Sequence, residues 1–376
     1  MEGEAQAVLD RIGADVSVRY EIHRLDPGRW KCVEIARALS ASPRVLLLDE
    51  ATAFLSRREA RAVLAAIGRL KTGGLVVAFV SHHLEEVGEA ADGLTILKDG
   101  RLVGNAAVGE LSTGELHARM VGRAVSADLY PPRSGARPGE PLVVLDRVAS
   151  DGVLEEVSLT VAPGEVLGVA GLKGSGPERV AELLAGDRRP SAGAMRLAGE
   201  PYRPATPGAA WRAGVAYLPG DRTGEGLILD FDVLSNVTLA ARPRRGPFFD
   251  RRRAWALTAG AIRDLGIKAR GPDTPCAALS GGNLQKVLLG KCLAPRPRVL
   301  VLNNPTRGVD VGARAEIYRI VRALAGAGVA VVLVSEDLPE LLGLSDRLVV
   351  MRKGRVTATV PAASVPGEEA VVAHMT

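Results

Sequence analysis

The chain has 376 residues, 47% of them hydrophobic and only 3% aromatic, so its length predicts two domains with largely aliphatic cores. Its 48 basic and 43 acidic residues leave a net charge of +5, which is too modest to indicate a nucleic-acid-binding protein. Three cysteines without paired short spacing argue against a disulfide framework or a zinc site. No apolar run reaches the roughly 18 residues that a membrane helix requires, so we expect membrane contact only through a partner.

The N-terminal part alternates helices with short apolar strands. Its periodicity predicts helices over residues 31–39 and 57–70, and apolar runs predict strands over 45–48 and 75–80. Continuous apolar strands between helices indicate a parallel α/β sheet that is covered on both faces.

A segment over 128–140 is rich in proline, glycine and arginine and lacks periodicity, which predicts an interdomain linker. We therefore expect a first domain over 1–125, a linker over 126–140 and a second domain over 141–376.

The second domain opens with a feature that the first does not contain. An apolar strand over 165–170 enters a glycine-rich turn, Gly171 to Gly176, and a helix is expected from Pro177 onward. Further along, helices are predicted over 286–293 and 312–325 and strands over 299–302 and 329–334.

The two domains repeat one another at a constant offset of 254 residues, from Leu25 to Leu279. Pro43 to Leu46 corresponds to Pro297 to Leu300, and Val80-Ser81 corresponds to Val334-Ser335. An offset that holds through helices, strands and loops indicates two copies of one domain, the first lacking its front half. We expect the missing strand to pair beside residues 45–48, whose edge is then unpaired and leaves the first half marginally folded.

A basic cluster runs from Arg242 to Arg253. We interpret it as a solvated face, because no aromatic platform or reading motif for nucleic acid accompanies it.

Several motifs carry a family likeness. Leu279 to Lys286 resembles the signature of ATP-binding cassettes, in the form typical of sugar importers, and Pro305 to Ala313 is similar to the segment after Walker B in their second cassette. The chain is thus similar to the tandem-cassette ATP-binding subunits of ABC importers for ribose, galactose or xylose. The resemblance implies a P-loop NTPase fold, α/β in class, with the first cassette incomplete and ATP bound between cassettes. It also implies ATP and Mg2+ as ligands.

By resemblance, the first composite site combines residues of the first domain with the signature of the second. Asp49 corresponds to the Mg2+ ligand, Glu50 to the residue that activates water, and His82 to the switch histidine that contacts the γ-phosphate. The signature that faces them is intact at Ser280, Gly281 and Gly282, and Asp310 joins the nucleotide-binding candidates. We find no Walker A sequence for this site.

The second composite site keeps the glycine spacing of a P-loop at Gly171, Gly174, Ser175 and Gly176. The Lys and the Ser or Thr that should follow are replaced.

The replacements span the whole second site. Pro177 lacks an N–H, and Glu178 opposite a phosphate at about 4 Å costs on the order of 1–4 kcal/mol. The other changed positions are Asn303 and Asn304 in place of the Walker B carboxylates, Glu336 at the switch position, Gly220 in the Gln loop, and Asp26 and Pro27 in the facing signature. We therefore expect the second site to be degenerate and ATP hydrolysis to be impaired.

Three interpretations remain open: a transporter subunit with impaired ATP hydrolysis, an ATPase whose upstream part is missing from this sequence, and a non-catalytic scaffold or decayed paralogue. The resemblance implies two membrane-spanning permease subunits and a substrate-binding protein as partners, with a homodimer or second cassette chain as further options and no nucleic acid. It also implies a cytoplasmic position on the inner face of the cell membrane. The sugar is not encoded in this chain, because specificity lies in other subunits.

Overall fold

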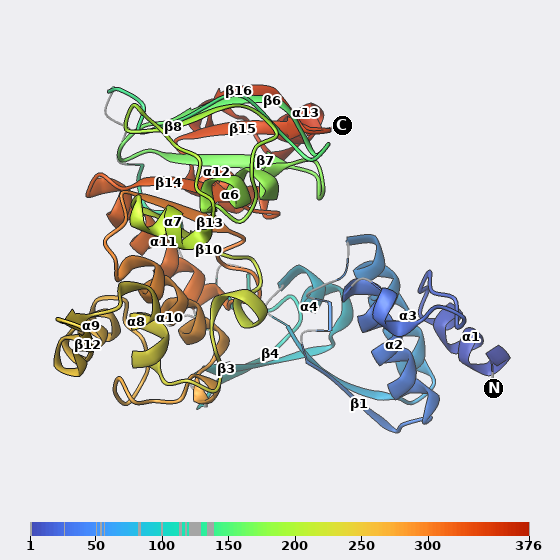
Figure 1. Cartoon of the computed structure of the whole chain (residues 1–376). Coiled ribbons are helices and arrows are strands. Elements are labelled where there is room, and N and C mark those ends of the chain that lie inside the picture. The colour runs from blue at the N-terminus through green and yellow to red at the C-terminus, as the bar shows by residue number, and fades with distance from the viewer. Residues whose placement is uncertain are drawn as a thin grey trace. The chain divides into compact units, whose positions relative to one another are not determined.

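The computed structural model describes residues 2–25, 27–49, 51–52, 55, 57–81, 84–98, 101–112, 115–116, 119, 129–133 and 139–375. The chain forms two compact units, Met1–Ser126 and Ala127–Thr376 (Figure 1). The division falls at the start of the expected linker. Tyr130, within that linker, stacks on Tyr318 of the second unit with ring centroids 5.2 Å apart, so this part of the linker packs on the second unit.

The second unit is built on a six-stranded sheet in the order β10-β13-β14-β7-β15-β16. All neighbouring pairs are parallel except β15 and β16, which are antiparallel. The strands are β7 (Val166–Gly171), β10 (Val215–Leu218), β13 (Val299–Asn303), β14 (Ala330–Val334), β15 (Arg347–Arg352) and β16 (Arg355–Pro361).

Alternate side chains of this sheet enter two separate cores. Leu300 and Leu302 of β13 pack with the helices on one face, whereas Val299 and Val301 pack on the other face with α6 (Pro177–Ala185) and a second sheet. Because both faces are covered, the strands are apolar at nearly every position.

The second sheet is antiparallel, in the order β6-β5-β8-β9. Its strands are β5 (Val143–Ser150), β6 (Leu154–Val161), β8 (Ala192–Leu197) and β9 (Glu200–Pro201).

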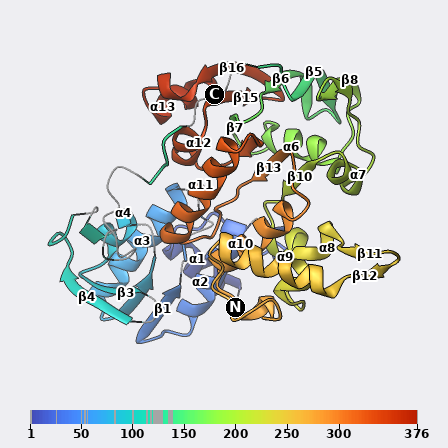
Figure 2. The ribbon, with the colours of Figure 1, turned by 90° about the vertical axis from the view of Figure 1, so that its left-hand side faces the viewer.

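The remaining helices of the second unit fall into two sets. Three of them gather at one end of the unit and are called here the helical group: α8 (Val233–Ala241), α9 (Arg251–Asp264) and α10 (Gly281–Leu293). A short hairpin of β11 (Arg244–Arg245) and β12 (Phe248–Phe249) projects from this group (Figure 2). The others are α7 (Pro207–Arg212), α11 (Val311–Gly326), α12 (Leu338–Leu344) and α13 (Glu368–Met375), with short helical turns at Arg222–Gly226, Cys276–Ala278 and Ala362–Ser364.

The first unit holds two separate two-stranded sheets, β1-β2 and β3-β4. β1 and β2 are parallel, and β3 and β4 are antiparallel. The elements are α1 (Glu2–Arg11), a turn at Ile22–Arg24, α2 (Pro27–Ser40), β1 (Val45–Asp49), α3 (Arg57–Thr72), β2 (Val76–Val80), α4 (Leu84–Ala90), β3 (Gly93–Lys98) and β4 (Arg101–Ala107). Helix α2 starts four residues earlier than expected, with proline in its first turn, where a missing N–H is tolerated.

The expectation that both faces of each sheet are covered is wrong for the first unit. Leu46 and Leu48 are buried in its core, but Val45 is 55% and Leu47 is 74% exposed. Their counterparts at the 254-residue offset, Val299 and Val301, are fully buried under α6 and the second sheet. The described residues of the first unit include no helix in that position, so one face of β1 is open.

The prediction that the missing strand pairs beside β1 is also wrong. In the second unit β7 pairs with β14 on one side and with β15 on the other, and not with β13. The equivalent place in the first unit is therefore between β2 and β3, two strands that belong to separate sheets. In the second unit, β13 also pairs with β10. Among the described residues of the first unit, β1 has no strand in the corresponding place.

Two adjacent leucines of β1 test the open face. Leu46→Ala removes a buried side chain and is expected to lower the free energy of unfolding by about 2–5 kcal/mol. Leu47→Ala on the exposed face is expected to change it by less than about 0.5 kcal/mol. Urea unfolding of the full chain, followed by Trp30 fluorescence with Trp211 and Trp255 replaced by Phe, measures both. Equal losses would show that the Leu47 face is covered in solution.

Candidate nucleotide site

Four neighbouring strands of the second unit end at one edge of the main sheet. β10, β13, β14 and β7 are parallel neighbours in that order, so their carboxyl ends meet there. In open α/β sheets this is the edge at which ligands bind. The edge carries Gly220 after β10, Asn303 at the end of β13, Glu336 after β14 and the glycine-rich turn after β7.

The glycine-rich turn has a backbone conformation that favours glycine at several positions. Gly174 and Gly176 have φ of +80° and +122°, in the region that favours glycine. A Cβ on Gly171 would lie 2.4 Å from the Ser175 hydroxyl oxygen, so this position also excludes side chains. The Ser175 N–H donates to the Leu172 carbonyl at 2.8 Å. The spacing of Gly171, Gly174, Ser175 and Gly176 therefore reflects a real turn.

The first two residues of the helix that follows the turn provide neither a cation nor a hydroxyl group. Pro177 is the first residue of α6 and is buried; it has no N–H to offer. Glu178, in the same first turn, suits the positive end of the helix dipole when no anion is bound, but it repels a phosphate. Lys173 is exposed and precedes the helix.

Asn303 and Asn304 use their amides to bond to each other and to the neighbouring strand ends. The Asn304 Nδ2 donates to the Asn303 Oδ1 at 3.0 Å, and the Asn303 Nδ2 donates to the Tyr217 hydroxyl at 3.3 Å. The Glu336 N–H donates to the Asn304 Oδ1 at 2.8 Å. Asn304 has a φ of +47°, a conformation that asparagine tolerates better than most residues. The pair thus links three strand ends through neutral hydrogen bonds.

Gly220 lies directly against this amide pair, because a Cβ on it would be 3.4 Å from the Asn303 Nδ2. Glu336, at the switch position, is exposed and is held through its backbone. The structure therefore brings together the positions that the sequence assigns to Walker B, the switch and the Gln loop.

The signature lies at the start of α10. Ser280 is the N-cap residue with φ −66° and ψ 159°, and its Oγ accepts a bond from the Asn283 Nδ2 at 2.8 Å. The Arg222 Nη1 donates to the Gly281 carbonyl at 3.1 Å. These contacts fix the loop while the Ser280 side chain makes no capping bond to its own helix.

Gly282 and Asp310 form a second contact of the signature. A Cβ on Gly282 would lie 2.7 Å from the Ala313 Cβ and 3.2 Å from an Asp310 carboxylate oxygen. Asp310 is the N-cap of α11, and its Oδ1 accepts from the Ala313 N–H at 2.9 Å. The structure gives Asp310 a capping role; its contact with nucleotide stays a prediction.

The catalytic candidates of the first unit are only partly described. Asp49 is the last residue of β1 and is exposed, so it stands at a strand end as expected. Glu50, His82 and Asp26 lie outside the described residues.

The same polar network occurs in both units at the same offset, buried in the second unit and part-buried in the first. In the second unit the Thr306 hydroxyl donates to the Glu340 Oε1 at 2.6 Å, and Ser335 also bonds this carboxyl. In the first unit the Thr52 and Ser81 hydroxyls donate to the Glu86 Oε2 at 2.5 and 3.3 Å. The network ties the loop after β1 or β13 to the next strand and helix, which supports the strand-end edge in both copies.

Sequence reasoning missed the residues that hold the site together: Arg222, Tyr217, Asn283 and Glu340. The bonds of Arg222, Tyr217 and Glu340 join residues that are far apart in the sequence. Asn283 bonds Ser280 nearby and also accepts from the Lys268 N–H, which is 15 residues away. The offset alone could have found Glu340, since Glu86 is its counterpart.

Known proteins with related sequences cover nearly the whole chain. It is 40% identical to the ribose import ATP-binding protein of Geobacillus kaustophilus over 360 residues, which is 95% of this chain and 72% of that protein. It is also 40% identical to a ribose import ATP-binding protein of Streptomyces coelicolor, over 96% of this chain and 70% of the relative. The sequence profile of the ABC transporter family matches residues 154–307.

The chain belongs to the ATP-binding subunits of sugar-type ABC importers. Proteins of this family use ATP with Mg2+. Among solved structures, an ATP-binding cassette of an ABC transporter matches with a TM-score of 0.55 and 20% identity, over 63% of this chain and all of the other. A dimeric cassette bound to ADP and phosphate matches with a TM-score of 0.52, over 58% of this chain. These likenesses show the cassette fold.

The Glu340 carboxyl should make the stability of the second unit depend on pH. Burial raises the pKa of Glu340, although bonds from Ser335 and Thr306 oppose the rise. A glutamate in the unfolded chain ionises near pH 4.3, so the folded state keeps this proton to higher pH and loses stability as the pH rises above that value.

Glu340→Gln removes this titration. The variant is expected to gain stability relative to the parent chain between about pH 5 and pH 8, measured by urea unfolding at both values. Glu336→Gln, an exposed change four residues earlier, controls for the loss of one negative charge. A difference between parent and Glu340→Gln that stays constant with pH would contradict the expectation.

Proposed function

We propose that this ATP-binding subunit serves an importer of ribose or a similar sugar, and that it contributes an intact signature but no complete Mg2+–ATP site of its own. The observation that carries the proposal is the strand-end edge of the second unit, which keeps its geometry while its charged groups are replaced. The names of the relatives support the sugar class.

Mg2+ and ATP do not fit this edge. Mg2+ prefers carboxylate oxygens and water in octahedral geometry, and the Walker B position offers neutral amides that already bond to one another. A triphosphate requires a cation where Pro177 stands and meets the Glu178 carboxylate instead. This edge therefore does not support ATP hydrolysis.

The first unit keeps the residues that correspond to the other parts of an ATP site. By family resemblance, Asp49, Glu50 and His82 correspond to the metal ligand, the water-orienting carboxylate and the switch group, and Ser280, Gly281 and Gly282 correspond to a signature. Phosphoryl transfer depends on such positioned charges. The site still requires a P-loop strand, and the place that β7 occupies in the second unit has its counterpart between β2 and β3. A further polypeptide segment or a second cassette chain would supply it.

The proposed partners follow from the family: two membrane-spanning permease subunits and a substrate-binding protein, with this chain on the cytoplasmic face of the membrane. None of the helices in the described part of the chain has the length and apolar composition of a membrane span. A non-catalytic scaffold is the second candidate function, favoured by the same loss of charged groups. Co-purification with permease subunits without any turnover would support it.

The isolated chain should not bind nucleotide in a magnesium-dependent way. We expect a fluorescent ATP analogue to bind weakly and to the same extent with and without Mg2+. We also expect the parent chain and the Glu50→Gln variant to show the same background rate of ATP hydrolysis. Tight, Mg2+-dependent binding by the parent chain would overturn the proposal.

Restoring the charged groups should reverse this behaviour. The triple variant Pro177→Lys, Glu178→Thr and Asn303→Asp returns a cation, a hydroxyl and a metal ligand to an existing loop. We expect it to gain Mg2+-dependent affinity of roughly tenfold or more, because each charge-assisted contact contributes about 1.5–3 kcal/mol. Glu200→Thr, which removes an exposed carboxylate in β9 away from the turn, is the control and should not change the affinity. A triple variant that folds but gains no affinity would mean that the loop is not a latent nucleotide site.

A further inference from the structure

A compact basic surface lies on the helical group, far from the glycine-rich turn in the sequence. We call it the arginine hairpin, residues 242–253, which runs from the end of α8 through β11 and β12 into α9. It carries six arginines and a single acidic residue, Asp250. All six arginines are exposed. This short segment therefore holds as much net positive charge as the whole chain.

The charge of the arginine hairpin is not neutralised by its neighbours. Within the described residues, no carboxylate lies at ion-pair distance from any of its six guanidinium groups, although Arg179, Arg322 and Arg347 elsewhere in the same unit are paired. The Asp250 carboxylate is used as the N-cap of α9, where it accepts from the Arg253 N–H at 2.9 Å. A cluster of unpaired cations creates a positive potential that attracts an anionic surface.

Two phenylalanines stand exposed in the same hairpin, Phe248 at 76% and Phe249 at 54%. The antiparallel register places Arg244 opposite Phe249 and Arg245 opposite Phe248. Directly opposite residues of a hairpin project from the same face, so each face presents one arginine and one phenylalanine. Trp255, one turn into α9, and Leu239 on α8 are also exposed. Contrary to the expectation of a basic cluster without aromatic groups, exposed aromatic side chains lie beside these arginines.

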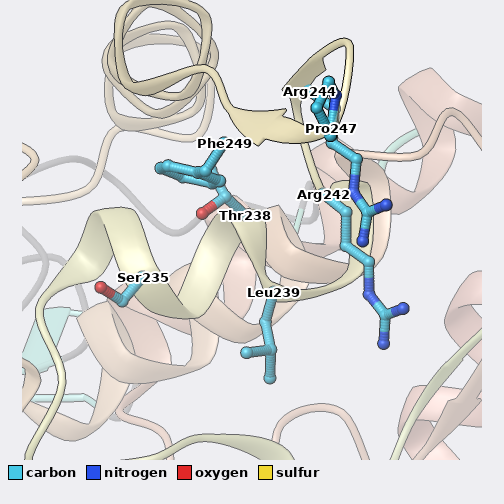
Figure 3. Close-up of a pocket in the computed structure, with 7 residues that line it drawn as sticks. All are labelled: Ser235, Thr238, Leu239, Arg242, Arg244, Pro247 and Phe249. Atoms are coloured by element: carbon cyan, nitrogen blue, oxygen red, sulfur yellow. The ribbon is translucent and has the colours of Figure 1, made fainter.

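One face of the hairpin borders an open cavity of about 450 Å³, which Arg242, Arg244 and Phe249 line together with Ser235, Thr238 and Leu239. In Figure 3 the Arg242 and Arg244 side chains extend in the same direction, and the Phe249 ring lies near Thr238. Arg242 ends α8 with a φ of +42°, which turns the chain sharply into the hairpin. The cavity offers two guanidinium groups beside apolar surface, a combination that suits a phosphate attached to an acyl chain.

We propose that the arginine hairpin docks directly on an anionic phospholipid surface, with Phe248 and Phe249 entering the headgroup region and Arg242 and Arg244 contacting lipid phosphates. Arginines next to aromatic side chains are the composition of interfacial membrane-binding segments. The alternation of arginine and phenylalanine on both faces of a protruding tip favours a lipid surface over nucleic acid, for which successive bases would stack along an extended groove. The inference does not depend on the nucleotide chemistry proposed above.

Sedimentation with large unilamellar vesicles tests the proposal on the purified full chain. Vesicles of phosphatidylcholine with about 30% phosphatidylglycerol should bind the chain at low salt, whereas vesicles of phosphatidylcholine alone should not, and salt near 0.5 M should release it. Equal sedimentation with both vesicles, or none with the anionic ones, would overturn the proposal.

Matched variants locate the contact. Arg242→Gln, Arg244→Gln and Arg245→Gln together should weaken vesicle binding roughly tenfold or more. The control triple, Arg196→Gln, Arg212→Gln and Arg352→Gln, removes the same charge from exposed positions elsewhere in the second unit and should leave most of the binding. Phe248→Ser with Phe249→Ser should weaken binding several-fold while its salt dependence persists. If the control triple lost as much binding as the hairpin triple, general charge and not this surface would be responsible.

A nucleic-acid arm separates the competing partner. A fluorescent single-stranded RNA should bind the parent chain no more tightly than it binds the triple variant with Arg242, Arg244 and Arg245 replaced by Gln. RNA binding that the hairpin triple abolishes, together with absent vesicle binding, would assign the surface to nucleic acid and refute the lipid proposal. Circular dichroism melting of every variant excludes unfolding as the cause, and all the substituted side chains are exposed.

Discussion

The central strand of the main sheet, β7, is the element on which most of the second unit depends. It pairs with β14 on one side and β15 on the other, and its carboxyl end opens into the glycine-rich turn. Asp346 strengthens this join, because its Oδ2 accepts from the Val166 N–H at 2.8 Å while Arg322 pairs with the same carboxylate. In the first unit the corresponding Asp92 pairs with Lys71, and the strands on either side of the equivalent place belong to separate sheets. One strand thus decides both sheet continuity and the presence of a phosphate loop.

The strand-end edge shows how a site can keep its shape after its charges change. Backbone conformation at Gly174 and Gly176 is set by glycine and by packing, so it persists when Pro177 and Glu178 follow. Asn303 and Asn304 hold the ends of β10, β13 and β14 through hydrogen bonds of their side-chain amides. These bonds stabilise that edge without an ion. The family fold and the residues that hold it are therefore separable from the residues that handle triphosphate and metal.

The helical group shows that charge alone does not identify a binding surface. A cluster of arginines in a sequence does not by itself indicate a partner, because most such clusters are solvated. The hairpin register adds that Arg244 and Arg245 each share a face with a phenylalanine, and the ion-pair pattern adds that none of the six arginines is neutralised within the described residues. These two facts, which depend on pairing across the turn and on distances to carboxylates, change the interpretation from a solvated face to a membrane-facing surface.

The sequence alone determined the repeat, the cassette family, the apolar strands and the positions of the changed site residues, since these depend on local composition and on an offset between identical residues. It also predicted Asp49 and Asn303 at strand ends. Strand order was decided only by the tertiary structure, because the neighbours of β7 are far apart in the chain and apolar strands carry no label for their partners. For the same reason the open face at Leu47, the bonds that Arg222 and Tyr217 make, and the buried Thr306–Glu340 pair became visible only when distant segments were brought together.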